Sequence, residues 1–597
     1  MSIKFSPTLP FGLALVIATA TGFLASTNAL AAVKHYDLII AEQVVNVTGK
    51  PVKRITVNGK FVAPLLEFEE GDDAVIRVYN KLKNQDSALH WHGLLLPGIM
   101  DGVPGFNQFK GIKPNQSYEY RFKIRQNGTY WYHSHSKGQE QDGLYGPLVI
   151  YPKNKIPLTS SEKTDRDYVV LLSDFHNSTS DEIMKNVKKD SDYYQNSRET
   201  VFDVAKQIKS TGLKATWKDR AMWNQMRMLK TDMSDVSGYT FLMNGKTPMQ
   251  NWTGNFKAGE KVRLRFINAS AMSFFDVRIP NLKMTVVSAD GQPVKAVPVD
   301  EFRIGTAETY DVIVEPKQAN YQILAESIDR SGFSIGTLHD ENTSAVKQIE
   351  MPKSRPRALL TMEDMGMNHD MSGMKSMDHD MASMMNNPQG HSMAGMTHDM
   401  SAMDTGDKTS TSKGSNTVFG WANASTPEGN KALQYSDLQS LTPQSDTRAP
   451  TREIEIRLDG NMERYIWTMN NKKFNEAQPI EVKYGERVRL KFVNDSMMAH
   501  PMHLHGMFVQ LENGQDPSNM PNKHTLIVAP GKTVTALLTA DELGEWAIHC
   551  HLLYHMSAGM MNKLIVAKVN PEHAADSTKA LPTPVPVIQG VNPHAHH

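Results

Sequence analysis

Cysteine is almost absent from this chain, because only Cys550 occurs in 597 residues. One thiol cannot form an internal disulfide, so cross-links do not hold the fold together even though exported proteins often use them. The chain also lacks a net charge, since 64 lysines and arginines balance 64 aspartates and glutamates. Without a basic stripe, nucleic acid and an anionic membrane surface are not expected as partners.

Long apolar runs are missing except near the start of the chain. Lys4 precedes an apolar run at residues 11–24, and Ala-Leu-Ala at residues 29–31 fits a small-residue cleavage site. The run is too short, and too rich in Thr and Gly, for a membrane anchor. We therefore expect residues 1–31 to be a cleaved signal peptide, with no membrane anchor in the mature chain.

The single cysteine lies among metal-binding side chains, in His549-Cys550-His551 followed by His555 and Met560. Alternate residues of a strand face opposite sides, so Cys550 points one way and its two neighbours the other. A thiolate, two imidazoles and a weak axial thioether form the ligand set of a blue-copper electron-transfer centre. The two flanking histidines are then left for a different metal on the far side.

Three further motifs carry paired histidines. They are His90-Trp91-His92, His133-Ser134-His135 and His500-Pro501-Met502-His503-Leu504-His505. About one such pair is expected by chance, whereas the spacing around the single cysteine has a chance likelihood of about one in ten thousand. Ordinary core histidines are the alternative, and the occurrence of all four motifs together favours copper ligands.

These motifs, intact and in this order, resemble those of the multicopper oxidases, and the resemblance covers nearly all of the mature chain. It implies a type 1 copper held by His500, Cys550, His555 and Met560. It implies a type 2 copper held by His90 and His503, and a type 3 pair held by His92, His133, His135, His505, His549 and His551. The expected cofactors are therefore four copper ions, with Cys550 in the catalytic path of the electrons.

The number of metals suits the reaction that the resemblance implies. Reduction of O₂ to two waters takes four electrons, while many reductants give up one at a time. One copper that accepts electrons and three that bind O₂ let charge accumulate without release of peroxide or superoxide. Asp101 stands where similar oxidases carry an acid near the type 2 copper, and we expect it to relay protons. The alternative is a turn aspartate before Gly102.

A stretch of alternating apolar and charged residues occurs three times, at residues 71–80, 259–268 and 485–494. Each copy begins with a turn glycine, ends in Asn and reads as a half-buried strand. Short strands with regular turns predict an all-β protein of β-sandwiches. The family resemblance specifies three cupredoxin-like Greek-key β-sandwich domains.

The repeats divide the chain into expected domains. The first spans residues 32–155 and the third residues 446–570, and both carry copper ligands. The second spans residues 156–350, has no histidine at the corresponding positions and contains an insertion near 181–240 that is helical in places. Because the trinuclear ligands come from the first and third domains, these two must meet, with the second as a spacer. Residues 571–597 are expected to form a flexible tail.

Residues 351–445 are expected to form a Met/His-rich disordered linker. Thirteen methionines stand among Asp, His, Gly and Ser between residues 361 and 403, with almost no aliphatic side chain to build a core. Thioethers prefer Cu(I), and His with Asp takes Cu(II), which predicts labile copper binding. The alternative is a low-complexity linker with methionine as filler. The predicted labile ligands are Met365, Met367, His369, Met371, Met377, His379 and Met381.

The place of this linker between the second and third domains, and the insertion around residues 223–238, are similar to the bacterial copper-resistance branch of the family. This resemblance implies a cuprous oxidase in the periplasm. Its partners would be O₂, Cu(I) or a small phenolic substrate, and a periplasmic copper-handling protein. Members of this branch commonly carry a twin-arginine signal; this N-terminus has Lys4 alone, which favours the general secretory route.

Two other functions stay open. A laccase-like enzyme would oxidise phenols, with the Met-rich segment only regulatory, and a copper-sequestering protein would store metal. Storage needs no thiolate entry site, which argues against the second. Five methionines near type 1 ligands either dock Cu(I) or pack the core; they are Met497, Met498, Met502, Met507 and Met556.

Overall fold

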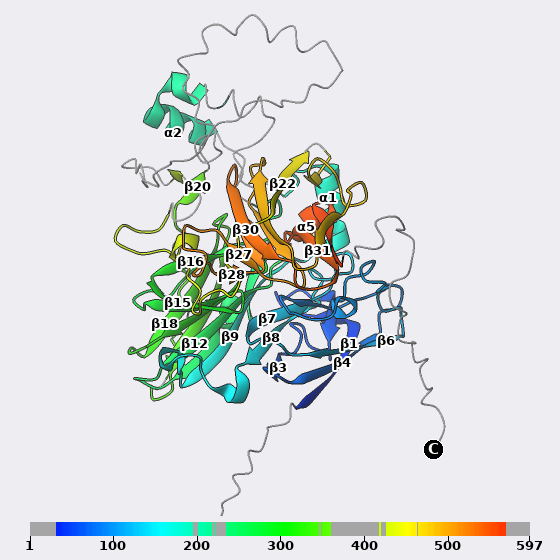
Figure 1. Ribbon diagram of the computed structural model, residues 1–597. Helices are drawn as coiled ribbons and strands as arrows, with labels where there is room; N and C mark the ends of the chain where they lie inside the picture. Colours follow the sequence, from blue (N-terminus) through cyan, green and yellow to red (C-terminus); the bar gives the residue numbers. More distant parts are fainter. Residues whose placement is uncertain are drawn as a thin grey trace, which may run out of the picture.

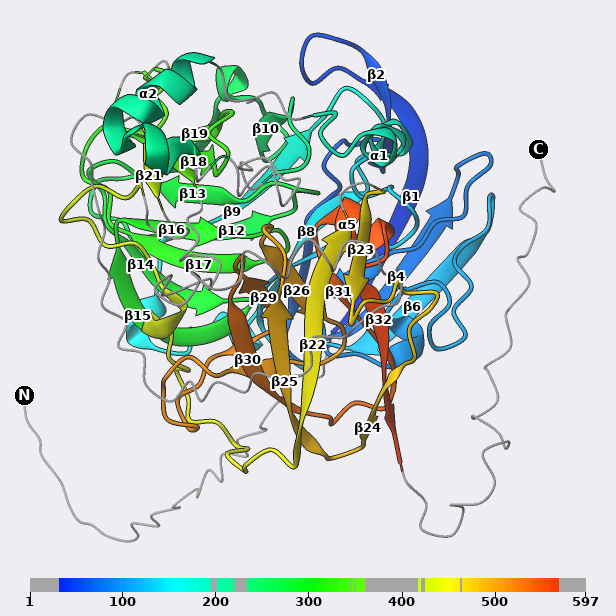
Figure 2. The same ribbon diagram turned by 90° about the horizontal axis from the view of Figure 1, so that it is seen from above.

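The computed structural model describes residues 32–194, 201–217, 220, 234–343, 345–347, 349–359, 417–419, 425–461 and 464–568. Three β-sandwiches lie side by side, in blue to cyan, in green, and in yellow to red (Figures 1 and 2). The predicted all-β fold of three cupredoxin-like domains is confirmed. The expected signal peptide, the candidate labile-copper ligands and the C-terminal tail lie outside the described residues.

Two four-stranded sheets form the first domain. One has the order β2-β1-β4-β6, with β2 (Val52–Val57), β1 (Val33–Val45), β4 (Asp73–Asn80) and β6 (Ser117–Lys123). The other has the order β3-β8-β7-β5, with β3 (Leu66–Glu69), β8 (Tyr145–Tyr151), β7 (Gly128–His133) and β5 (His90–His92). The histidine motifs therefore lie at one edge of the second sheet.

The second domain has a six-stranded and a five-stranded sheet. The first has the order β10-β9-β12-β17-β14-β15, with β10 (Thr240–Met243), β9 (Arg166–Phe175), β12 (Val262–Asn268), β17 (Thr309–Val314), β14 (Met284–Ala289) and β15 (Gln292–Val299). The second has the order β11-β19-β18-β13-β16, with β11 (Trp252–Phe256), β19 (Phe333–Asp340), β18 (Asn320–Ser327), β13 (Phe275–Arg278) and β16 (Glu301–Ile304). Helices α1 (Ser180–Lys189) and α2 (Val201–Thr211) lie in the insertion that was expected to be helical.

The third domain repeats this plan. One sheet has the order β23-β22-β25-β30-β27-β28, with β23 (Ile466–Met469), β22 (Arg452–Asn461), β25 (Arg487–Asn494), β30 (Thr533–Thr539), β27 (Val509–Leu511) and β28 (Asn522–Lys523). The other has the order β24-β32-β31-β26-β29, with β24 (Ile480–Lys483), β32 (Met561–Ala567), β31 (Gly544–Cys550), β26 (His500–Leu504) and β29 (Thr525–Val528). Helix α5 (Leu553–Ser557) follows the cysteine strand.

A few short elements complete the described chain. They are the 3₁₀ helices η1 (Gly98–Met100), η2 (Lys153–Lys155), η3 (Ser160–Glu162), η4 (Pro248–Gln250) and η6 (Tyr435–Asp437), and the paired strands β20 (Arg357–Leu359) and β21 (Thr417–Phe419). Within the described residues, none of the helices is long and apolar enough to cross a membrane.

The repeated stretch occupies the same place in each domain, as β4, β12 and β25. Each pairs in parallel with the first strand of its domain and antiparallel with a later strand. The Asn that ends each copy is buried, and its side-chain amide donates to carbonyls of the following loop and of a distant segment; these residues are Asn80, Asn268 and Asn494. Buried carbonyls need such partners. In the first and third domains, the loops secured in this way lead directly to His90 and His500.

The end of the expected linker is ordered, which corrects the sequence analysis for residues 425–445. Leu433 and Leu438 are buried in the core of the second domain. The Tyr435 hydroxyl donates to Glu308 Oε1 at 2.6 Å. These leucine and aromatic side chains are of the kind that residues 361–403 lack, so this part of the linker has apolar surface to bury.

Candidate copper centres

Cys550 ends β31, and its thiol faces two imidazoles. Cys550 Sγ lies 3.5 Å from His500 Nδ1 and 3.8 Å from His555 Nδ1, and the two nitrogens are 3.2 Å apart. The centre of this triangle is about 2 Å from each corner, which is the length of a metal–nitrogen bond. All three side chains are fully buried. The predicted thiolate site is therefore assembled from two segments of the third domain.

Met560 is held beside this triangle by its backbone. Its carbonyl accepts the N–H of Cys550 at 3.1 Å, and its N–H donates to the carbonyl of His555 at 3.0 Å. The side chain is fully buried. The structure thus brings the backbone of Met560 next to two of the expected ligands.

Burial sets the charge state of these groups. It raises the pKa of the Cys550 thiol, so the thiolate forms there only with a cation to stabilise it. Burial also holds the pKa of His500 well below its usual value, which keeps this imidazole neutral and able to bind a metal. A neutral imidazole beside a potential thiolate fits copper.

The two neighbours of Cys550 point to the opposite side, as the strand argument predicted. His549 Nε2 lies 3.0 Å from His505 Nε2 and 3.4 Å from His135 Nε2. His551 Nε2 lies 3.3 Å from His133 Nε2. Covalent neighbours on one strand therefore serve two separate clusters.

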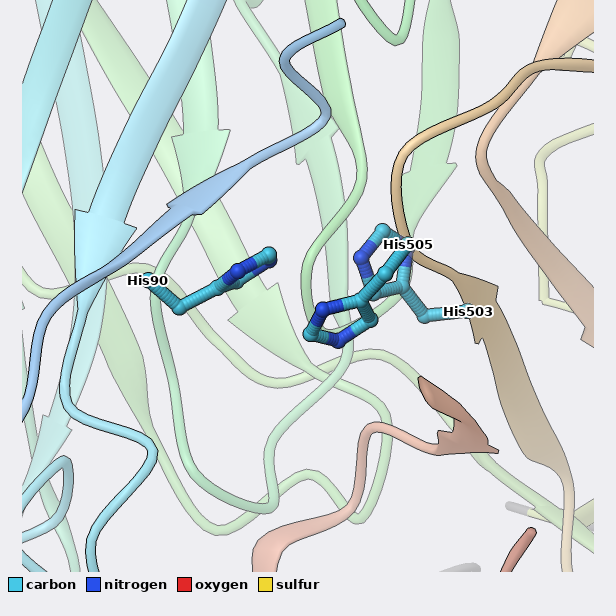
Figure 3. A group of neighbouring side chains, drawn as sticks. All are labelled: His90, His503 and His505. Atoms are coloured by element: carbon cyan, nitrogen blue, oxygen red, sulfur yellow. The ribbon is translucent and has the colours of Figure 1, made fainter. Parts of the chain in front are cut away.

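The second cluster lies between the first and third domains. Figure 3 shows His90, from the first domain, facing His503 and His505 of the third. The rings of His90 and His505 stack with centroids 3.8 Å apart, and those of His92 and His503 are equally close. The predicted meeting of the two domains is confirmed. The histidines gathered here are His90, His92, His133, His135, His503, His505, His549 and His551.

Backbone carbonyls fix the tautomers of two of these rings. Nδ1 of His90 lies 2.8 Å from the carbonyl of Asp101, and Nδ1 of His503 lies 2.8 Å from the carbonyl of His524. Donation from Nδ1 leaves Nε2 as a lone-pair donor, and both Nε2 atoms are buried without a partner. His92 presents the other nitrogen, since its Nδ1 is the buried atom without a partner.

Facing lone pairs in a dry cluster are costly unless a cation lies between them. Burial lowers the pKa of His549 to about 4 and that of His503 and His505 well below the usual value. Neutral imidazoles without carboxylate ligands suit copper and not Mg²⁺ or Ca²⁺. The donor set therefore fits several copper ions held close together.

Sequence models of multicopper oxidases match residues 40–155, 166–350 and 447–570. Copper resistance protein A of Escherichia coli is 46% identical over 576 residues, which cover 89% of this chain and 92% of that protein. The chain belongs to the multicopper oxidase family. A homologue of copper resistance protein A from Pseudomonas syringae pv. tomato is also 46% identical, over 560 residues, with the same shares of both chains covered.

A solved structure supports the fold. The laccase from Botrytis aclada superposes with a TM-score of 0.60, covering 90% of this chain and 88% of that one at 20% sequence identity. This multicopper oxidase thus has one type 1 copper site and a trinuclear site built from its histidine clusters, which together take four copper ions.

Asp101 lies at the junction of the two copper-bearing domains. Its Oδ2 is 2.8 Å from His505 Nδ1, and its Oδ1 is 3.3 Å from His90 Nδ1. Asp101 also ends the helix η1, as a turn aspartate would. Its carboxylate contacts one candidate ligand from each domain, so it does more than end a turn.

Two buried acids that contact candidate ligands were missed by the sequence analysis. Glu140 Oε2 lies 2.8 Å from His133 Nδ1, and burial raises the pKa of Glu140. Asp235 Oδ2 lies 2.6 Å from His555 Nε2 and accepts the Tyr465 hydroxyl at 2.9 Å. Glu140 belongs to a loop with no metal motif, and Asp235 comes from the insertion of the second domain.

The second domain is more than the expected spacer. Asp290 Oδ2 accepts the backbone N–H groups of His524 and Thr525, at 3.2 and 3.1 Å, and lies 3.0 Å from Lys523 Nζ. The carbonyl of His524 in turn accepts from His503. A carboxylate of the second domain, which has no candidate copper ligand of its own, therefore positions a candidate copper ligand of the third domain.

Most methionines near the type 1 site pack the core. Met498, Met502 and Met507 are each 2% exposed and belong to the core of the third domain. Met497 is also buried. Their burial favours the alternative that these four pack the core. Met556 is half-buried and lines a pocket.

Proposed function

We propose that this multicopper oxidase couples one-electron oxidation of Cu(I) to four-electron reduction of O₂ to water. Phenols and catechols form a second class of reductant. The observation that carries the proposal is the end of β31, where Cys550 faces one metal site and its two neighbours face the other. Bound copper would supply the electron acceptor at the first site and the O₂-reducing centre at the second.

The proposal assigns each ligand a role. His500, Cys550, His555 and Met560 hold the type 1 copper. His90 and His503 hold the type 2 copper, and their tautomers support this role because each presents an unpartnered Nε2. His92, His133, His135, His505, His549 and His551 hold the type 3 pair.

Within this proposal, Asp101 relays protons toward the oxygen-reducing site. Its contacts with His90 and His505 support the role. An Asp101→Asn variant keeps its shape and loses the acid. At equal copper content, we expect oxygen uptake to be slowed about a hundredfold, in line with general acid catalysis. Unchanged oxygen uptake would refute the role.

We further propose that the protein acts in periplasmic copper resistance. Its similarity to proteins named copper resistance protein A supports this setting. Residues 1–31 would direct export by the general secretory route, and residues 361–403 would supply labile copper. A periplasmic copper-handling protein would be a partner.

Oxygen consumption with Cu(I) and with a phenol tests the proposal, on the intact protein and on one lacking residues 361–403. We expect the intact protein to consume oxygen with both reductants. The shortened protein should lose cuprous activity and keep phenol oxidation. An intact, copper-loaded protein that does not oxidise Cu(I) would overturn the cuprous role, and retention of cuprous activity after the deletion would overturn the role of the Met-rich segment.

A further inference from the structure

An open pocket of about 500 Å³ lies beside the type 1 site. Its walls come mainly from the third domain, and helix α1 of the second domain adds Lys188. The lining residues group into short segments: residues 464–466, residues 473–475, residues 556–559 and Met561. A volume of this size suits a small organic molecule.

The pocket is directly connected to the type 1 ligands. Met556 follows His555 in the chain, and Gly559 and Met561 flank Met560. A molecule in this pocket would thus contact residues that are bonded directly to the proposed ligands His555 and Met560. The wall is also the outer surface of α5 and the start of β32.

Tyr465 provides a second connection. It lines the pocket, and its hydroxyl donates to Asp235, which also contacts His555 Nε2 at 2.6 Å. The Tyr465 backbone has a φ of 47°, a conformation that bulky residues rarely adopt. Such strain persists where the surrounding structure over-determines a position, as at ligand and active sites.

The charge of the pocket is positive. Lys188 and Arg464 are exposed, and neither forms an ion pair within the described part of the chain. Lys473 is the third cation and pairs with Glu476 at 2.9 Å. Among the described residues no carboxylate lines the pocket. A bare Cu⁺ ion would be repelled here, whereas an anion would be attracted.

The remaining wall suits an aromatic ring. Phe474 is 39% exposed and lies nearly parallel to Phe106 of the first domain, with centroids 6.0 Å apart. The contact with Phe106 holds this aromatic wall in place. Met556 and Met561 add thioethers, which make favourable contacts with aromatic rings. An aromatic body with an anionic substituent matches both parts of the pocket.

We infer that this pocket binds phenols that carry a carboxylate, as reductants of the type 1 copper. The inference rests on the proposed function because electrons must enter at that copper, and it adds the class of organic substrate. With copper bound, each phenol would give up one electron at the type 1 site and one proton to solvent, and would leave as a phenoxyl radical. Four such electrons, with four protons, would balance the reduction of one O₂ to two waters.

Three substrates that share one ring test the inference: a dimethoxyphenol, its para-carboxylate and its para-aminomethyl derivative. We expect the lowest KM for the carboxylate, an intermediate KM for the neutral phenol and the highest KM for the ammonium form. Neighbouring members of this series should differ about fivefold in KM, as for a single partly exposed charge pair. Raising the salt concentration should shrink these differences. Equal KM values for the three, or differences that do not respond to salt, would overturn the inference.

Variants locate the effect. Lys188→Gln and Arg464→Gln should each raise the KM of the carboxylate about fivefold. They should leave kcat, the KM of the neutral phenol and the blue absorption unchanged, and Lys83→Gln, on an exposed loop of the first domain, serves as the control. A KM that rises equally for all three substrates would refute charge recognition. If Cu(I) is oxidised and the charge series is flat, this inference alone fails; if neither Cu(I) nor any phenol is oxidised, the proposed function fails.

Discussion

Asp235 and His555, which are 320 residues apart, share a contact of 2.6 Å between Oδ2 and Nε2. The aspartate belongs to the insertion of the second domain, and the histidine is a proposed ligand of the third. The carboxylate fixes the His555 tautomer so that Nδ1 faces Cys550. A carboxylate hydrogen-bonded to a ligating histidine also adds negative charge near the metal, which favours its oxidised state.

Asp235→Asn should therefore raise the reduction potential of the type 1 copper. Loss of the negative charge removes a stabilisation of Cu(II). A tenfold change in the equilibrium between Cu(II) and Cu(I) corresponds to a rise of about 60 mV in the potential of a one-electron couple. Redox titration of the blue absorption measures the change. Asp495→Asn, at an exposed position, is the control, and an identical potential in both variants would contradict the prediction.

Glu140→Gln should weaken metal binding at the trinuclear site. Glu140 Oε2 contacts His133 Nδ1, and removal of such a partner lowers metal affinity about 10- to 100-fold. Copper analysis after dialysis against a chelator measures the loss. The blue type 1 absorption should persist, since Glu140 contacts neither Cys550 nor its partners. Full retention of four copper ions would show that the contact is dispensable.

Asp290 and Glu308 form a matched pair for the role of the second domain. Both lie 3.0 Å from Lys523 Nζ, and all three groups are fully buried. Asp290→Asn and Glu308→Gln should each destabilise the protein by about 1 to 3 kcal/mol, because each removes a hydrogen-bonded carboxylate from a buried cluster. Denaturant unfolding measures this loss.

The two variants should differ in copper content. Only Asp290 holds the backbone of His524 and Thr525, which positions the acceptor of His503. Asp290→Asn should therefore reduce the type 2 copper signal in electron paramagnetic resonance, while Glu308→Gln retains it. Equal signals in the two variants would contradict a positioning role for the second domain.

The metal-free protein should lose stability in mild acid. Burial lowers the pKa of His524 and His549 to about 4, below the value of 6.5 for an exposed histidine. Between these values the unfolded chain binds more protons than the folded one, so the free energy of unfolding falls as the pH decreases. Urea unfolding at about pH 7 and about pH 5 tests this, because the reference pKa of histidine, about 6.5, lies between these two pH values. Equal or higher stability at the lower pH would contradict it.

The sequence was sufficient for features that depend on local spacing. Alternation on a strand placed Cys550 opposite His549 and His551, and the structure confirms it. The three Asn-terminated repeats indicated three similar sandwiches because each copy forms the same half-buried strand. Split ligand sets required the first and third domains to meet.

Contacts between distant segments could not be predicted in this way. Asp235, Glu140 and Asp290 contact or position ligands across loops and domain interfaces, and no spacing pattern connects them to the histidine motifs. The methionines near the type 1 site were ambiguous for a related reason. A thioether packs a core as readily as it binds Cu(I), and only burial separates the two.

Absorption near 600 nm, the approximate band of a copper–thiolate bond, tests the central claim most directly when it is followed as reductant and then O₂ are added. The copper-loaded protein should be blue, bleach with reductant and regain its colour with O₂. Cys550→Ser should lack the band, keep trinuclear copper and consume no oxygen. A colourless copper-loaded protein, or a Cys550→Ser variant that still reduces O₂ at the original rate, would contradict electron entry through Cys550.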